Sequence, residues 1–167
     1  MNTATWATTD THVGPFTAVV DADGAVLASG WTAELDELLP QIHPSLRPGE
    51  LVPGDLGPVA EAITRYHDGD LSAIDAVPVR QRSGLFLEHA WEVLREVPAG
   101  APVTYTEYAA KAGRPAAVRA AAAACARNAA ALFVPCHRVL RSDGTLGGFR
   151  WGVQVKRQLL DHEVGHK

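Results

Sequence analysis

Cys136 and His137 are the two neighbouring residues of this sequence whose types could do covalent chemistry. They lie in the segment PCHRV at positions 135–139, which follows an apolar run over 129–134. A cysteine thiolate is a strong nucleophile, and an adjacent imidazole can accept the proton of the thiol. Because proline has no N–H to donate, the apolar run is expected to end at Val134 and to leave Cys136 on a turn. A buried, inert cysteine beside a surface histidine would have the same local sequence, so the remaining chain must decide.

The composition indicates a globular protein. The 167 residues are 47% apolar and 20% charged, enough for one ordinary domain or two small ones. No apolar stretch approaches the roughly 20 residues that span a bilayer, and the first eleven residues have neither a basic region nor an apolar core. We therefore expect a cytoplasmic protein with no membrane partner, in which Cys125 and Cys136 are both free thiols.

Charge is distributed unequally between the two halves of the chain. Residues 1–84 contain 12 acidic and 4 basic side chains, a net charge of −8, whereas residues 85–167 contain 7 acidic and 11 basic, a net charge of +4. The whole chain is at −4. A polyanion would be attracted to the second half, which also contains Cys136.

The first half, residues 1–84, is predicted to be a small α/β domain with a short antiparallel sheet. Two apolar segments, 16–20 and 25–29, flank an Asp-Ala-Asp-Gly sequence that suits a tight hairpin turn. Pro58 is well placed as the first residue of a helix that ends near residues 67–69. A short helix is expected over 33–39 and a further strand over 75–80, and residues 82–84 mark the boundary with the second half.

The second half, residues 85–167, is predicted to be helical. Apolar side chains at helical spacing indicate a helix over about 86–94. The sequence Thr104-x-x-Glu107 is a capping-box pattern that begins a helix at Tyr105, and Gly113 should end it near residue 112. Pro115 should begin a second helix that runs to about residue 126, and the two helices have the proportions of a helix-turn-helix. By spacing alone, two short core helices would look the same.

The second of these helices is nearly all alanine, with Arg119 as its one long basic group. Direct readout of bases needs several long polar side chains, so sequence-specific recognition is disfavoured. A helix without long side chains is thinner than the usual ~10–12 Å and can approach the minor groove of DNA closely. Packing of the alanines against another helix or sheet explains the composition equally well.

These residues resemble the O6-alkylguanine-DNA alkyltransferases, direct-reversal repair proteins also called methylated-DNA–protein-cysteine methyltransferases. The PCHRV segment matches the active-site signature of that family, and Tyr105, Arg119, Asn128 and Glu163 lie at the family's distances from it. The first half resembles the family's more variable N-terminal domain. The resemblance implies an α+β protein, with an α/β N-terminal domain and an all-helical, winged-helix-like C-terminal domain that contains the helix-turn-helix.

The resemblance also implies roles for individual residues. Cys136 would take the alkyl group from guanine O6, once per protein molecule, and would need a thiol pKa some two units below its usual value near 8.5 for ready attack at neutral pH. His137 would accept the thiol proton through a bound water, oriented by Glu163, while Asn128 would brace the turn. Without the family, a solvated Glu163 near a helix end would be the simpler interpretation.

Chemistry on guanine O6 requires the nucleotide to be rotated out of the duplex. By resemblance, Arg119 would fill the gap in the base stack, and Ala116, Ala120 and Ala123 would face the DNA. Tyr105 would press on a phosphate and later give a proton to the departing guanine. The substrate pocket would be formed by Cys125, Val139, Phe149, Arg150 and Trp151.

The implied partner is double-stranded DNA containing O6-alkylguanine, bound in the minor groove by a monomer with weak sequence dependence. No cofactor is expected, and no metal, since the zinc ligands of some family members are missing from a chain with no cysteine before Cys125. A non-catalytic, alkyltransferase-like lesion-binding protein is the main alternative, but Cys136 argues against it. A cysteine hydrolase would need a route that releases an acyl group, and a helix-turn-helix beside the thiol has no place in that scheme.

Overall fold

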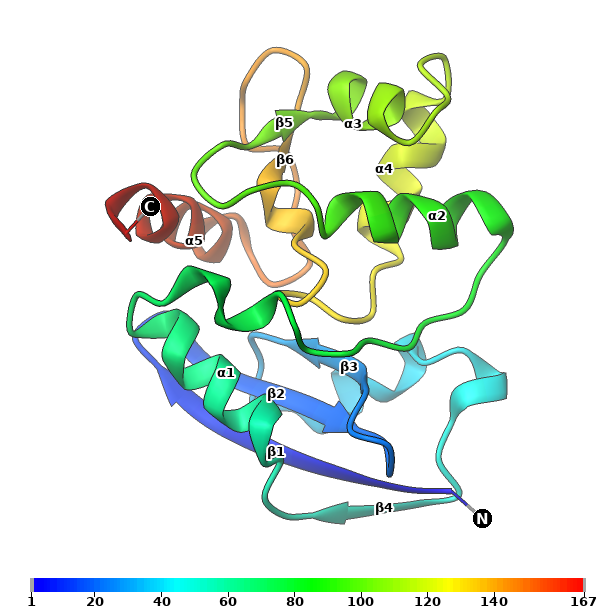
Figure 1. The fold of residues 1–167 in the computed structure, drawn as a ribbon, viewed down its shortest axis with the longest axis vertical. Helices are drawn as coiled ribbons and strands as arrows, with labels where there is room; N and C mark the ends of the chain where they lie inside the picture. The colour runs from blue at the N-terminus through cyan, green and yellow to red at the C-terminus, as the bar shows by residue number, and fades with distance from the viewer. Residues whose placement is uncertain (1, 167) are drawn as a thin grey trace. The chain divides into compact units, whose positions relative to one another are not determined.

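The computed structural model describes residues 2–166 and divides the chain into two compact units (Figure 1). Unit 1 comprises the chain up to Arg82 together with residues 129–133, and unit 2 comprises residues 83–128 and the chain from Val134 onward. Residues 129–133 were expected in the second half, whereas the structure packs them with the first. Within residues 2–166, no helix combines the length and the apolar character needed to cross a membrane.

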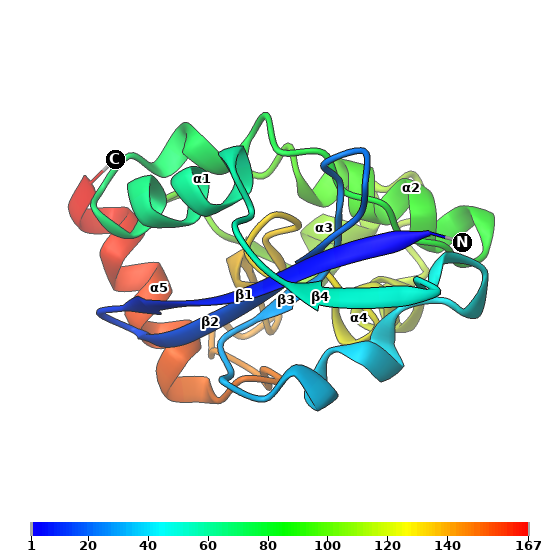
Figure 2. The same cartoon turned by 90° about the horizontal axis from the view of Figure 1, so that it is seen from below.

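Unit 1 is built on a four-stranded sheet in the order β3-β2-β1-β4, whose strands are labelled in Figure 2. The strands β1 (Thr3–Thr11), β2 (Gly14–Val20) and β3 (Val26–Gly30) are antiparallel neighbours, and β4 (Glu50–Pro53) runs parallel to β1. The predicted hairpin between β2 and β3 is confirmed. Its turn is held by the Asp21 carboxylate, which accepts the backbone N–H groups of Asp23 and Ala25, each at 2.9 Å.

The single α-helix in the described part of unit 1 is α1 (Pro58–His67), which begins at the predicted proline and packs on β1 (Figure 1). It buries the side chains whose helical spacing predicted it, which are Val59, Ala62, Ile63 and Tyr66. A short 3-10 turn, Leu35–Glu37, stands in place of the helix expected over 33–39, and two more, Leu39–Gln41 and Pro44–Leu46, follow it. Prolines at the starts of the last two turns prevent a continuous helix.

The strand expected over residues 75–80 is wrong. A 3-10 turn, Leu71–Ile74, precedes this segment, and within the segment only Val79 makes an isolated parallel bridge, to Val26. Val26 donates its N–H to the carbonyl of Pro78 at 2.8 Å and accepts from the N–H of Arg80 at 2.9 Å. Because Pro78 has no N–H of its own, it cannot extend a hydrogen-bonded ladder.

Residues 129–133 complete the core of unit 1. Ser29 on β3 donates its backbone N–H to Ala129 at 2.8 Å and its hydroxyl to the carbonyl of Ala131 at 2.7 Å. The ring of Phe133 meets that of Phe16 in an edge-to-face contact with centroids 6.2 Å apart. Residues 129–133 are therefore buried in unit 1, and Val134, the last residue of the apolar run, belongs to unit 2 and directly precedes the PCHRV segment.

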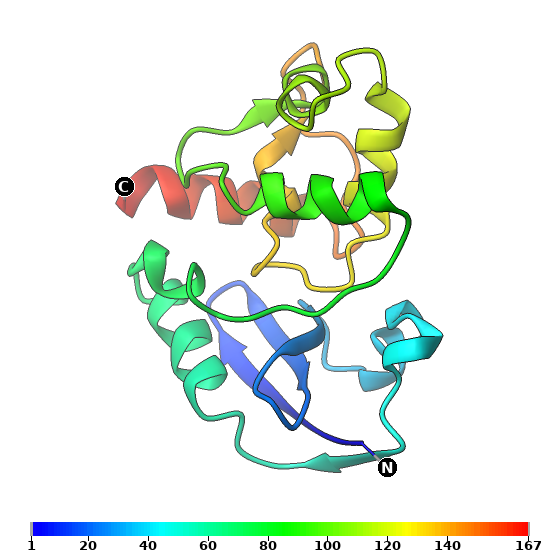
Figure 3. The same cartoon turned by 45° about the vertical axis from the view of Figure 1, so that its right-hand side comes forward.

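Unit 2 is mostly helical (Figure 3). The helices α2 (Leu85–Leu94), α3 (Tyr105–Lys111) and α4 (Val118–Ala126) pack on one another, and α5 (Val153–His166) packs on a 3-10 turn, η5 (Cys136–Arg138). The unit is not entirely helical, since β5 (Val103–Thr104) and β6 (Val139–Leu140) form a two-residue parallel pair. Pairs this short carry no alternating pattern by which a sequence could predict them.

The start of α3 follows the sequence closely. Thr104 accepts the backbone N–H of Glu107 through its hydroxyl at 3.1 Å, and the Glu107 carboxylate accepts the N–H of Thr104 at 2.9 Å, so the predicted capping box is confirmed. Gly113 follows the end of α3 with a φ of 90°. Helix α4 begins at Val118, three positions after the predicted start at Pro115, because residues 114–117 form a turn.

Candidate active site

Cys136 begins the turn η5 directly after Pro135, as the sequence predicted. The carbonyl of Val134 accepts two hydrogen bonds, from the backbone N–H of Cys136 at 2.8 Å and from the side-chain amide of Asn128 at 2.7 Å. Asn128 and Cys136 are only 4% and 8% exposed. Asn128 therefore holds the turn that carries the thiol, the position that the resemblance implied for it.

His137, Glu163 and Arg138 form a buried cluster beside this turn. The Nε2 atom of His137 lies 2.7 Å from a carboxylate oxygen of Glu163. Arg138 donates to the same carboxylate from Nε at 3.0 Å and from Nη2 at 2.9 Å, and a further bond from Nη1 reaches the carbonyl of Val97 at 2.8 Å. None of the three side chains exceeds 4% exposure. The interpretation of Glu163 as a solvated residue near a helix end is therefore wrong.

The charges in this cluster determine which nitrogen of His137 carries the proton. Although burial acts to raise it, His137 and Arg138 hold the pKa of Glu163 well below its usual range, so the carboxylate is ionised. Burial lowers the pKa of His137, against the opposing effect of Glu163, so the ring is neutral at neutral pH. An ionised carboxylate can only accept hydrogen bonds, so Nε2 donates and the buried Nδ1 is left as the proton acceptor.

The electrostatics at Cys136 differ from the expectation of a lowered thiol pKa. Burial raises the pKa of Cys136, and this effect outweighs a hydrogen bond from Asn128 and the positive charges of Lys156 and Arg150, which lower it. The resting thiol is therefore protonated at neutral pH. A nucleophilic sulfur must be produced by proton transfer at the time of reaction, which is the task that a neutral imidazole acceptor can perform.

Tyr105 is half-buried at the first position of α3. Burial raises its pKa to about 12, with further increases from the nearby Cys125 and Cys136 and a smaller opposing effect from Arg141. The phenol therefore keeps its proton at neutral pH and can donate a hydrogen bond. Its electrostatic interaction with Cys125 and Cys136 indicates that it lies near both thiols.

Two residues with clear positions in this site were not assigned roles from the sequence. Arg138 neutralises Glu163, and Lys156 on α5 is 1% exposed, with Nζ 3.5 Å from the carbonyl of Gly148. Burial lowers the pKa of Lys156, while Cys136 and Cys125 act to raise it. Lys156, Leu159 and Glu163 follow one another at helical spacing and are the buried residues of α5. That spacing could have predicted that the lysine shares a buried face with Glu163.

Apart from Tyr105 on α3, the predicted DNA-binding residues lie on and before α4. Arg119 is exposed on the helix, while Ala120 and Ala123 are half-buried. Ala116 is exposed but precedes the first residue of α4, so its expected place on the helix is wrong. Another face of α4 is structural, because Trp91 donates its indole N–H to the carbonyl of Ala124 at 2.8 Å. Packing within unit 2 therefore explains the buried alanines of α4, Ala121 and Ala124, and Arg119 lies on an exposed face of the same helix.

The predicted pocket residues come from three elements of unit 2. Cys125 is half-buried near the end of α4, and Val139 is fully buried in β6. Arg150, in the loop before α5, donates to the carbonyl of Ala126 at 2.9 Å and so joins that loop to α4. Besides the larger effect of burial, Cys136 acts to raise the pKa of Cys125, and Arg150 acts to lower the pKa of Cys136. Both residues therefore lie near the Cys136 thiol. Phe149 and Trp151 are half-buried in the same loop, and their place in the pocket stays a prediction.

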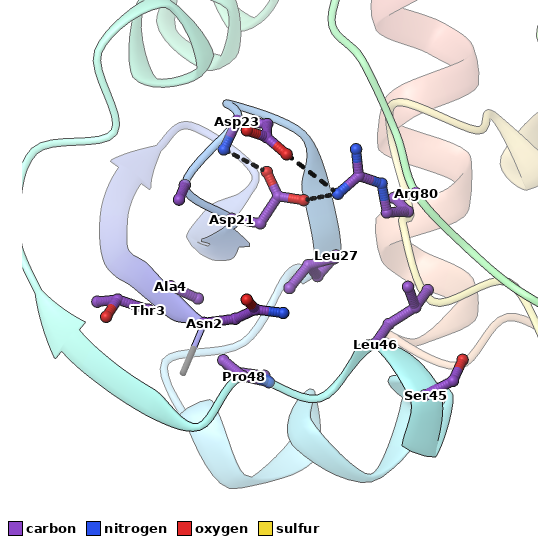
Figure 4. A pocket seen from close by; sticks show the side chains of 11 residues that line it. Asn2, Thr3, Ala4, Asp21, Asp23, Leu27, Ser45, Leu46, Pro48 and Arg80 are labelled. Atoms are coloured by element: carbon purple, nitrogen blue, oxygen red, sulfur yellow. Dashed lines mark hydrogen bonds and ion pairs between the residues drawn. The ribbon is translucent and has the colours of Figure 1, made fainter.

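Unit 1 contains a hollow of about 190 Å³ that none of the predicted site residues lines (Figure 4). Its polar groups bind one another, since Arg80 contacts the carboxylates of Asp21 at 2.6 Å and Asp23 at 3.5 Å. Asp21 also holds the β2–β3 turn, as described above. These contacts stabilise the hairpin.

Comparison with known proteins identifies the family. Residues 85–165 match the family model described as 6-O-methylguanine DNA methyltransferase, DNA binding domain. The methylated-DNA–protein-cysteine methyltransferase of Salmonella typhimurium is 36% identical over 92% of this chain and 91% of its own length. The bifunctional transcriptional activator/DNA repair enzyme Ada of Escherichia coli is 40% identical over 84% of this chain, which spans only 39% of the length of Ada. The structure of Mycobacterium tuberculosis OGT in complex with DNA is 25% identical, with a TM-score of 0.80 over 97% of this chain and 94% of that chain.

The fold and the buried thiol-imidazole-carboxylate arrangement thus occur in a protein with a DNA-binding methyltransferase domain. The chain belongs to the family of methylated-DNA–protein-cysteine methyltransferases, because its relative from Salmonella typhimurium matches it over nearly the full length of both proteins. The resemblance drawn from the PCHRV segment is confirmed, as is the mixed α+β fold.

Proposed function

We propose that this protein repairs DNA by transferring the alkyl group of O6-alkylguanine irreversibly to the sulfur of its own Cys136. One observation carries the proposal. The turn that begins with Cys136 also contains His137 and Arg138, and both of these side chains bind the buried carboxylate of Glu163. A structural cysteine would need no neutral imidazole held in one tautomer by an ionised, arginine-paired carboxylate. The family assignment and the exposed Arg119 on α4 support DNA as the partner.

The transfer is a single displacement. The thiol proton of Cys136 passes through a bound water to Nδ1 of His137, and the ionised Glu163 stabilises the resulting imidazolium. The sulfur then attacks the alkyl carbon, so that a carbon–sulfur bond forms as the bond from that carbon to guanine O6 breaks. Tyr105 gives a proton to the departing guanine, which leaves as the repaired neutral base. Its raised pKa keeps that proton available until the guanine anion develops.

The reaction happens once per protein molecule. A thioether is a poor leaving group, and none of the side chains described around Cys136 provides a route to break the new carbon–sulfur bond. The protein is therefore consumed stoichiometrically. It acts as a cytoplasmic monomer and needs neither a cofactor nor a metal.

The DNA is bound along its minor groove by α3 and α4. The lesion nucleotide is rotated out of the stack, and Arg119 fills the space that it leaves. Ala120 and Ala123 allow α4 to approach the groove closely, with Ala116 in the preceding turn. Because the contacts are mainly with phosphates, binding depends weakly on sequence and weakens as salt rises. The pocket for the base is lined by Cys125, Val139, Phe149, Arg150 and Trp151.

Intact-mass measurement after mixing the protein with a duplex that contains O6-methylguanine tests the proposal. We expect the mass to increase by one methyl group per molecule and the modification to map to Cys136. Cys136→Ser and Cys136→Ala should bind the duplex without gaining mass, while Cys125→Ser, the matched control, should retain transfer. Repeated turnover would exclude the single-use mechanism, and lesion binding without a mass change in the wild type would favour the non-catalytic, alkyltransferase-like alternative.

A further inference from the structure

The parallel pairing of β5 with β6 puts Arg141 next to Tyr105. In this pair Thr104 lies opposite Leu140. The next residues along the two strands are Tyr105, at the first position of α3, and Arg141, at the start of the loop after β6. The two side chains are close enough for the charge of Arg141 to lower the pKa of Tyr105 against the larger effect of burial.

The loop that carries Arg141 is fixed at this place. One position further along the same register, the hydroxyls of Thr106 and Ser142 lie 2.6 Å apart. The loop closes on itself, since the carbonyl of Arg141 accepts the N–H of Gly144 at 2.8 Å and its N–H donates to Thr145 at 3.0 Å. The backbone at Arg141 is therefore held against the first turn of α3.

The side chain of Arg141 extends along the backbone of Gly147. Gly147 has a φ of +74°, and a Cβ at this position would lie 3.3 Å from Cγ and 3.6 Å from Nε of Arg141. Arg141 is exposed, and no carboxylate among residues 2–166 lies within ion-pair distance of its guanidinium. Asp143 in the same loop uses its carboxylate to accept the N–H and hydroxyl of Thr145, at 3.0 and 2.7 Å. The charge of Arg141 contributes, after the bonds to Thr145, to lowering the pKa of Asp143, but the guanidinium forms no ion pair with that carboxylate, so its donors can bind an external anion.

We infer that Arg141 and Tyr105 together bind one phosphodiester group of the DNA strand that carries the lesion. A guanidinium presents parallel N–H donors that match two phosphate oxygens, and the phenol adds a third donor. Arg141 thereby neutralises the phosphate on which Tyr105 presses while the nucleotide rotates out, and it is a positioning residue. The inference rests on the proposed function, because it assigns a contact to the same DNA complex.

The first test compares Arg141→Ala with Arg157→Ala. Arg157 is an exposed arginine on α5, so its replacement removes the same charge from the same unit. Binding to an O6-methylguanine duplex should weaken about tenfold in Arg141→Ala, the lower range for a charged hydrogen bond. The slope of log affinity against log salt should also fall by about 1. Equal losses in the two variants would overturn the inference.

The second test removes the charge from the DNA instead. Duplexes with a neutral methylphosphonate at single positions around the lesion should reveal one phosphate whose replacement slows transfer by the wild type much more than transfer by Arg141→Ala, which keeps only the Tyr105 contact. Transfer from free O6-methylguanine, which has no phosphate, should be equal in both proteins. If the methylphosphonate and Arg141→Ala slow transfer additively at every position, or if Arg141→Ala slows transfer from the free base, Arg141 does not act by binding a phosphate. Failure of the wild type to take up methyl would overturn the proposed function itself, whereas normal wild-type transfer with unaltered Arg141→Ala binding would overturn this inference alone.

Discussion

Replacing Glu163 by glutamine tests the buried charge on which the candidate site depends. The change keeps the size of the side chain but removes the negative charge that faces Arg138 at 2.9 Å and His137 at 2.7 Å. Arg138 would then remain charged in a buried position with no carboxylate beside it. Removing one partner of a buried ion pair costs about 3–5 kcal/mol. We therefore expect Glu163→Gln to lose a large part of the ~5–15 kcal/mol that stabilises a typical domain.

Urea unfolding at neutral pH measures this loss. Glu61→Gln is the matched control, since Glu61 lies 3.7 Å from Arg65 in an exposed pair and its change should cost less than about 1 kcal/mol. Replacing Arg138 by methionine in the Glu163→Gln protein should recover part of the stability, because no unpaired charge is then buried. A loss below about 1 kcal/mol in Glu163→Gln would refute the view that this carboxylate stabilises the unit through its charge.

The pH dependence of the same variant gives a second, independent readout. The pKa of Glu163 is lowered in the folded protein, so the folded state favours the ionised form. The stability due to this carboxylate is therefore complete above its unfolded pKa of about 4.3 and is lost as the pH falls toward the folded pKa. The difference in unfolding free energy between the wild type and Glu163→Gln should accordingly narrow below about pH 4. A difference that stays constant on acidification would contradict the lowered pKa.

Three further substitutions address the DNA, the turn and the pocket. Arg119→Ala should slow transfer from duplex DNA far more than from free O6-methylguanine, and equal losses on both substrates would exclude its role in filling the base stack. Asn128→Ala removes the hydrogen bond to the carbonyl of Val134. It should lower the free energy of unfolding by about 1–3 kcal/mol and slow alkyl transfer. An unchanged transfer rate in single-turnover assays would show that the turn keeps its conformation without this bond. In the proposed pocket a benzyl group would press on the indole of Trp151, and compressing a packed side chain costs roughly 1–3 kcal/mol. O6-benzylguanine should therefore inactivate the wild type much more slowly than methylated duplex does, and Trp151→Gly should reduce this difference in rate. Equal rates for the two substrates in the wild type would place Trp151 outside the pocket.

Several elements follow from short stretches of sequence, because the interactions that form them are local. The Asp21 carboxylate and its neighbours two and four positions away make the β2–β3 turn, and the helix α1 begins at Pro58. Thr104 and Glu107 satisfy each other's backbone N–H groups at the start of α3. The position of Cys136 on a turn likewise follows from the adjacent proline. In each case the physical cause lies within a few residues of the feature.

Other features depend on contacts between distant segments. The parallel pairing of β4 with β1 joins residues nearly fifty positions apart, and residues 129–133 join unit 1 through hydrogen bonds to Ser29. The interpretation of 75–80 as a strand was wrong for the same reason, since only the neighbouring segment shows that Val79 makes a single bridge. No local pattern records which strands become neighbours.

The candidate active site also has features that follow from the sequence and features that depend on contacts between distant segments. The sequence by itself identified Cys136, His137 and, through the family resemblance, Glu163 as a set. Only the tertiary structure shows that Glu163 is buried, that Arg138 shares its carboxylate, and that burial raises rather than lowers the pKa of the Cys136 thiol. The physical reason is that protonation depends on desolvation and on charges brought together from separate elements, here η5 and α5. Residue types name the groups that can react, and their packing sets the protonation state in which they do so.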